Sequence, residues 1–110
     1  MFRLELLSLT CNQTEDRGTP RDEPRMTVNG AWVFGPGDMN EGDVVNLAGR
    51  SETFINNALV SLVDVDTPGA DDFIGSVTVV GANDVNQGER TVTLGGSDGE
   101  YELMYYVVLA

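Results

Sequence analysis

The apolar residues of this chain fall in short runs of four to eight, and this spacing constrains its fold more than any other feature. Gly, Pro, Asn and Asp separate the runs, and no stretch keeps apolar residues three and four positions apart for the length of a helix. Such runs are typical of β-strands. We predict strands at residues 2–10, 25–29, 31–34, 43–47, 58–64, 74–80, 89–94 and 101–109. Eight short strands predict an all-β fold of the sandwich type.

The length of the chain fits one domain. Its 110 residues can bury about two-thirds of their unfolded surface, which is enough for one core and too little for two. Asn29 and Gly30 separate two apolar runs and predict a hairpin with a type I′ turn, because both central residues of that turn take positive φ. The segment 51–57 is too short and mixed to assign to a helical turn or a loop. We predict a single domain over residues 1–110.

The charge of the chain narrows the choice of partners. Eighteen acidic residues against six basic ones give a net charge of −12, and all six bases are Arg. Nucleic acids and anionic lipids are bound through Lys and Arg side chains that neutralise phosphates. We therefore expect neither nucleic-acid binding nor a polybasic membrane contact. A cation is the more natural partner for such a chain.

The absence of His, with Cys11 as the one cysteine, removes most enzyme mechanisms. Ser-His-Asp and Cys-His arrangements need a His base, and the common zinc sites use His and Cys ligands. Cys11 has no basic neighbour in the sequence, so we interpret it as a buried structural thiol. A carboxylate pair of the glycosidase kind stays open. We predict that the domain is not an enzyme, and that it has no transmembrane segment because no uncharged apolar run approaches membrane-spanning length.

Acidic residues gather in two turn-rich segments. The first holds Glu15, Asp16, Asp22 and Glu23, and the second holds Asp64, Asp66, Asp71 and Asp72. Asp64 and Asp66 alternate along an extended chain, so their side chains point to the same side. Residues 67–70 then turn the chain and return Asp71 and Asp72 to the same strand end. Like charges about 4 Å apart repel by roughly 1 kcal/mol in water and about 4 kcal/mol near a protein surface, so these carboxylates call for a cation.

Calcium fits these ligands best. It accepts six to eight oxygens in flexible geometry, whereas magnesium keeps fewer protein ligands and zinc prefers nitrogen and sulfur. An EF-hand is excluded, because the twelfth position counted from Asp64 is Gly75, where that motif needs a Glu. The alternative interpretation is that both segments are solvated acidic turns without an ion.

The second acidic segment resembles the third calcium loop of C2 domains. Residues 64–75 carry a D-x-D pattern, a further Asp, and then Phe-Ile-Gly, as that loop does. The first segment is similar to the first calcium loop of the family, in which an Asp is followed several residues later by Asp-Pro-Tyr. Asp16 and Asp22 have the family's separation, and Pro24 follows. Glu23 stands between Asp22 and Pro24, so either Asp22 or Glu23 could take the ligand role.

The resemblance implies an eight-stranded antiparallel β-sandwich of the C2 type with Ca²⁺ as its cofactor. The first predicted strand leads directly into the first acidic segment, and the last two strands resemble the end of the phospholipase C type, so the type II strand order is implied. The implied calcium ligands are Asp16, Asp22 or Glu23, Asp64, Asp66 and Asp72, with Asp71 as a secondary candidate.

The function that the resemblance implies is calcium-dependent binding or targeting, with phospholipid headgroups as one partner. The predicted loop tips carry no large apolar residue, so no strong membrane wedge is expected. Two other functions stay open. One is a calcium-stabilised structural or adhesive domain, and the other is a carbohydrate-binding module that meets glycans through calcium-ordered loops.

Overall fold

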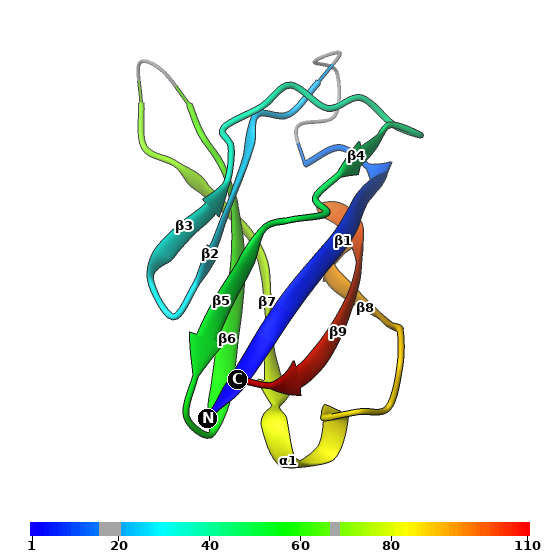
Figure 1. The fold of residues 1–110 in the computed structure, drawn as a ribbon. Coiled ribbons are helices and arrows are strands. Elements are labelled where there is room, and N and C mark those ends of the chain that lie inside the picture. The colour runs from blue at the N-terminus through cyan, green and yellow to red at the C-terminus, as the bar shows by residue number, and fades with distance from the viewer. Residues whose placement is uncertain (16–20, 67–68) are drawn as a thin grey trace.

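Two antiparallel β-sheets form the computed structural model of this chain, which describes residues 1–15, 21–66 and 69–110 (Figure 1). The elements in chain order are β1 (Phe2–Gln13), β2 (Pro24–Val28), β3 (Ala31–Phe34), β4 (Val44–Asn46), β5 (Ser51–Phe54), β6 (Asn57–Asp64), β7 (Asp72–Val80), α1 (Gly81–Asp84), β8 (Arg90–Gly96) and β9 (Gly99–Leu109). One sheet has the order β4-β1-β9-β8, and β5 also pairs with β1. The other sheet has the order β3-β2-β6-β7.

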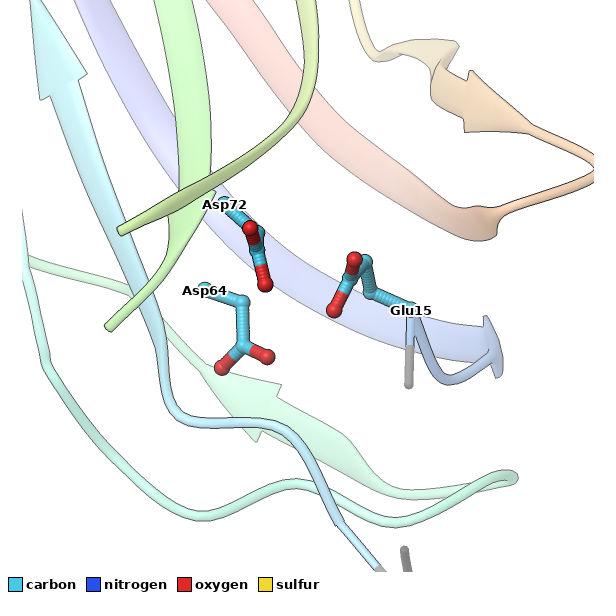
Figure 2. A group of neighbouring side chains, drawn as sticks. All are labelled: Glu15, Asp64 and Asp72. Atoms are coloured by element: carbon cyan, nitrogen blue, oxygen red, sulfur yellow. The ribbon is translucent and has the colours of Figure 1, made fainter. Parts of the chain in front are cut away.

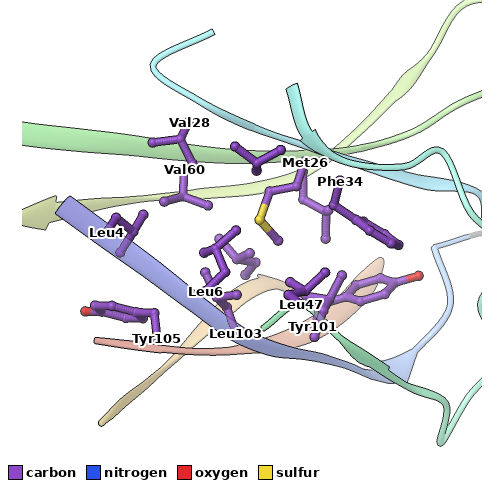
Figure 3. Close-up of a cluster of buried hydrophobic side chains, with 14 of the residues drawn as sticks. Leu4, Leu6, Met26, Val28, Phe34, Leu47, Val60, Tyr101, Leu103 and Tyr105 are labelled. Carbon is purple, nitrogen blue, oxygen red and sulfur yellow. The ribbon is translucent and has the colours of Figure 1, made fainter. Parts of the chain in front are cut away.

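The hydrophobic core lies between the two sheets (Figure 3). Buried and outward-facing residues alternate along β6 and along most of β9, as expected for strands with one face on a core. Leu4 and Leu6 on β1 and Met26 on β2 are inaccessible to solvent or nearly so. Burying a side chain of this kind contributes about 1.5–3 kcal/mol, so this layer supplies the main stabilising force of the domain.

The all-β sandwich is confirmed, with nine strands in the described residues in place of the eight predicted. The additional strand is β5, in a segment that the sequence left unassigned. Its four residues include one buried side chain, Phe54, so the local pattern is weak. The strand forms because it pairs with β1 from Phe2–Phe54 to Glu5–Ser51. The described residues contain no helix with the length and apolar character that a bilayer crossing requires.

The turn between β2 and β3 is the predicted one. Asn29 and Gly30 have φ values of 50° and 84°, as a type I′ turn requires at both central positions. The side chain of Asn29 also reaches β6, where its Oδ1 accepts a hydrogen bond from the backbone N–H of Leu59 at 2.8 Å. The turn is therefore tied to the neighbouring strand as well as to its own hairpin.

Gly75 lets the two sheets approach closely along one edge. A Cβ atom at this position would lie 2.2 Å from the backbone nitrogen of Gly95 on β8. We expect Gly75→Ala to lower the free energy of unfolding by about 1–3 kcal/mol, because the two backbones must separate to admit the methyl group. Gly96→Ala is the matched control, since a Cβ there meets nothing within 4 Å. Denaturant unfolding measures both variants, and unchanged stability of Gly75→Ala would contradict the close approach.

The strand ends bring both acidic segments to one end of the sandwich (Figure 1). Asp64 at the end of β6 pairs with Pro24 at the start of β2 on one side and with Asp72 at the start of β7 on the other. β1 ends at Gln13 and leads directly into the first acidic segment. This is the chain order from which the type II arrangement was predicted.

Candidate metal centre

Three carboxylates from distant parts of the chain converge at this end of the sandwich (Figure 2). Glu15 follows β1, Asp64 ends β6 and Asp72 begins β7. One carboxylate oxygen from each lies within 4.8 Å of those of the other two. These three residues are termed the carboxylate cluster below.

Strand pairing places Asp64 beside Asp72. The two residues are direct partners across the β6–β7 ladder, so their side chains stand on the same face of the sheet. Like charges directly opposite each other in a ladder are destabilising. Asp64 is 4% exposed, and its Oδ1 accepts a hydrogen bond from the backbone N–H of Glu23 at 2.8 Å. Asp72 is exposed, so the cluster has a buried side fixed by the backbone and a side open to solvent.

Asp22 is completely buried beside the cluster. Its Oδ2 accepts two hydrogen bonds of 2.7 Å, one from the backbone N–H of Glu15 and one from the hydroxyl of Tyr101. Burial, and then the bond to Asp22, raises the pKa of Tyr101 far above its ordinary value. The phenol is therefore protonated and donates this hydrogen bond over the whole physiological pH range.

Glu15 shows the largest electrostatic effect of the crowding. Burial, and then the charge of Asp72, raises the pKa of Glu15 to about 7. Burial also raises the pKa of Asp64, although the N–H of Glu23 opposes this change. Oε2 of Glu15 is buried and has no hydrogen-bond partner among the described residues. Such an oxygen is costly to bury, and a bound cation would supply the missing partner.

The pKa of Glu15 predicts that the metal-free protein becomes less stable as the pH rises. The fold holds this proton with a pKa of about 7 against an ordinary value of 4.5, so its stabilising contribution is complete below about pH 4.5 and lost as the pH rises through about 7. Melting temperatures in chelator should be lower at about pH 8 than at about pH 6. Glu15→Gln should flatten this dependence. A wild-type melting temperature that rises from about pH 6 to about pH 8 would contradict the raised pKa of Glu15.

Two acids among the predicted ligands, Glu23 and Asp71, lie outside the cluster. The side chain of Glu23 is exposed, and this residue reaches Asp64 through its backbone N–H. Asp71 forms an ion pair with Arg25, in which Nη2 and Oδ2 are 3.1 Å apart. The guanidinium of Arg25 also lies 4.9 Å from the centre of the Trp32 ring. Asp71 is therefore held toward the outer face of β2 and β3.

The other predicted ligands take three different positions. Asp64 and Asp72 belong to the cluster, Asp66 is half-buried in the segment after β6, and Asp16 lies outside the described residues. Glu15 is the cluster member to which the sequence assigned no ligand role. The feature that could have indicated Glu15 is its position just after the longest strand, at the start of the first acidic segment.

The donor set of the cluster suits a hard divalent cation. All its ligand atoms are carboxylate oxygens, which calcium and magnesium prefer. Calcium takes more protein oxygens than magnesium and tolerates bidentate carboxylates in irregular geometry. The unpartnered oxygen of Glu15 and the raised pKa values fit a site that gains a positive charge.

Solved structures with a similar fold include C2 domains. One C2 domain aligns over 96% of this chain and 95% of its own length, with a TM-score of 0.57 and 15% identity. A C2 domain of plant extended synaptotagmin 1 aligns over 99% of this chain and 94% of its own, with a TM-score of 0.55 and 9% identity. A structure of two C2 domains of extended-synaptotagmin 2 gives a TM-score of 0.53 and 19% identity, and the match covers 96% of this chain and 40% of that one. No family model matches the sequence, and no curated protein matches it.

The chain therefore has a C2-like fold. At these identities the likeness concerns the arrangement of the strands, and it confirms the predicted C2-like fold.

Proposed function

We propose that this chain is a non-enzymatic, calcium-binding C2-like module whose bound ions mediate attachment to phospholipid. The observation that carries the proposal is the carboxylate cluster of Glu15, Asp64 and Asp72, with its mutual distances within 4.8 Å. The C2-like fold supports it, because the cluster lies where the two acidic segments meet at one end of the sandwich.

Calcium is held in this proposal by the three cluster carboxylates. Asp66 and Asp16 are retained as further ligands, because each lies within two residues of a cluster member along the chain. Six to eight oxygens complete a calcium site, so carbonyls, water or a lipid phosphate fill the remaining positions. The open side of the cluster, at the exposed Asp72, gives such a phosphate access.

Phospholipid is the partner that a calcium ion at this position fits. The protein carries a charge of −12 and no Lys, so an anionic bilayer repels it unless ions bridge the acidic loops and the lipid phosphates. Phe73 follows Asp72 directly and is 65% exposed. Its ring offers an apolar contact with the bilayer beside the proposed ions. The acidic loops have no polybasic segment that could bind anionic lipid.

Vesicle binding tests this function. We expect the protein to sediment with phosphatidylserine vesicles in calcium and to remain in solution in chelator, because the ion supplies the contact. Direct coordination persists in moderate salt, whereas long-range repulsion is screened beyond about 8 Å at physiological ionic strength. Asp72→Asn should abolish vesicle binding. Glu41→Gln should keep it, because Glu41 lies in an exposed turn and is not a member of the cluster.

Strong vesicle binding in chelator would contradict the ion-mediated mechanism. Failure to bind at every calcium concentration, with calcium binding itself intact, would refute the lipid partner. The calcium-stabilised structural or adhesive role would then replace it, and a glycan array in calcium would examine the carbohydrate-binding role.

A further inference from the structure

A buried hydrogen-bond chain runs from strand β9 to the carboxylate cluster. The Tyr101 hydroxyl donates to Oδ2 of Asp22 at 2.7 Å, and the same oxygen accepts the backbone N–H of Glu15 at 2.7 Å. Tyr101 and Asp22 are both completely buried. One carboxylate oxygen therefore links a core phenol to the backbone of the residue that supplies a cluster carboxylate.

Backbone pairing fixes both Tyr101 and Asp22. Tyr101 pairs with Cys11 on β1 and with Leu94 on β8, so it lies in the interior of its sheet. The backbone of Asp22 exchanges two hydrogen bonds with Met39, each 2.9 Å long. The Asp22 carboxylate is thus held in place from two directions, by its own backbone and by the phenol.

We propose that Tyr101 and Asp22 are positioning residues of the calcium site, which act by fixing the backbone of Glu15. The inference rests on the proposed function, since it assumes that Glu15 binds calcium. It gives Asp22 a structural task in place of the ligand role that its sequence position suggested. Partners that orient metal ligands in this way commonly change metal affinity by about tenfold to a hundredfold when removed.

The physical reason is the location of Glu15. It lies beyond the last residue of β1, where no strand pairing constrains it. The hydrogen bond to Asp22 anchors its backbone there. When that bond is weakened, the Glu15 carboxylate must be ordered at the moment the ion binds, and this ordering subtracts from the affinity.

Tyr101→Phe is the variant that tests the inference, and Tyr105→Phe is its matched control. Tyr105 lies on the same strand and donates a hydrogen bond of the same length, 2.7 Å, to Asp84. Figure 3 shows the two rings at opposite ends of the buried cluster. Each change removes one hydroxyl and leaves the ring in place. We expect Tyr101→Phe to weaken calcium binding about tenfold or more and Tyr105→Phe to change it by less than about twofold.

A double-mutant cycle separates positioning from general loss of stability. If Tyr101 acts through Glu15, the effect of Tyr101→Phe on calcium affinity should disappear in a Glu15→Gln background. Equal losses of affinity in the Tyr101 and Tyr105 variants would overturn the inference. So would a full, additive loss in the Glu15→Gln background.

Hydrogen exchange in the calcium-free protein tests the hydrogen bonds from Tyr101 through Asp22 to Glu15 in the absence of the ion. The Glu15 amide should exchange about tenfold faster in Tyr101→Phe than in the wild type, and at the wild-type rate in Tyr105→Phe. Unchanged protection of Glu15 in Tyr101→Phe would overturn the positioning role. A wild-type protein that shows this protection pattern but no calcium binding would instead refute the proposed function.

Discussion

Calcium is expected to raise the melting temperature of this protein by about 10 °C or more. An ion that binds only the folded state stabilises it by RT ln(1 + [L]/Kd), which is about 2.7 kcal/mol at a hundredfold excess over Kd. The effect should be larger at about pH 8 than at about pH 6, because the proton that Glu15 holds with a pKa of about 7 competes with the ion. Differential scanning calorimetry in calcium and in chelator measures both differences.

The starting material for this comparison must be free of metal, as shown by elemental analysis. Magnesium at the same concentration is the control ion, and it should stabilise the protein less because it keeps more of its own water. Equal melting temperatures in calcium and in chelator would refute the calcium site.

Asp64→Asn has the second large expected effect. This change should lower calcium affinity about tenfold or more, since it removes a charged ligand from the buried side of the cluster. The calcium-free variant should be as stable as the wild type or more stable, because Asn removes a repelling charge and its oxygen can still accept the N–H of Glu23. Melting curves with and without calcium report both quantities.

Glu41→Gln and Glu102→Gln are the controls for Asp64→Asn. Each removes one negative charge from a residue outside the cluster. Both should bind calcium like the wild type. If all three variants lose affinity alike, diffuse attraction by the charge of −12 explains the binding, and the cluster does not.

The fold could be predicted from the sequence wherever a strand carries its own pattern. β6 and β9 alternate buried and outward residues, and Asn29-Gly30 encodes its turn through positive φ. β5 has no such pattern, since one of its four residues is buried and its pairing partner lies about fifty positions earlier in the chain. A strand of this kind is specified by its partner, which local periodicity does not reveal.

The candidate site could be predicted from local sequence in the second acidic segment, and only in part in the first acidic segment. Asp64 and Asp72 lie at the ends of adjacent strands, and the spacing between them showed that they return to one place. In the first segment, the sequence left the ligand role open between Asp22 and Glu23. The structure buries Asp22, which accepts a hydrogen bond from Tyr101, more than seventy positions away. Glu15, to which the sequence gave no ligand role, lies in the cluster. This long-range hydrogen bond decides which of several neighbouring acids turns inward. The spacing of acidic residues along the sequence does not reveal such a contact.

Calorimetric titration of the metal-free protein with calcium tests the central claim most directly. We expect saturable binding in the wild type, about tenfold or more weaker binding in both Glu15→Gln and Asp64→Asn, and wild-type binding in Glu41→Gln. Proton release in buffers of different ionisation enthalpy should accompany binding near neutral pH, because Glu15 has a pKa of about 7 and must lose its proton to the ion. A titration without saturable binding in the wild type, or with equal affinity in all four proteins, would show that the carboxylate cluster is not a calcium site.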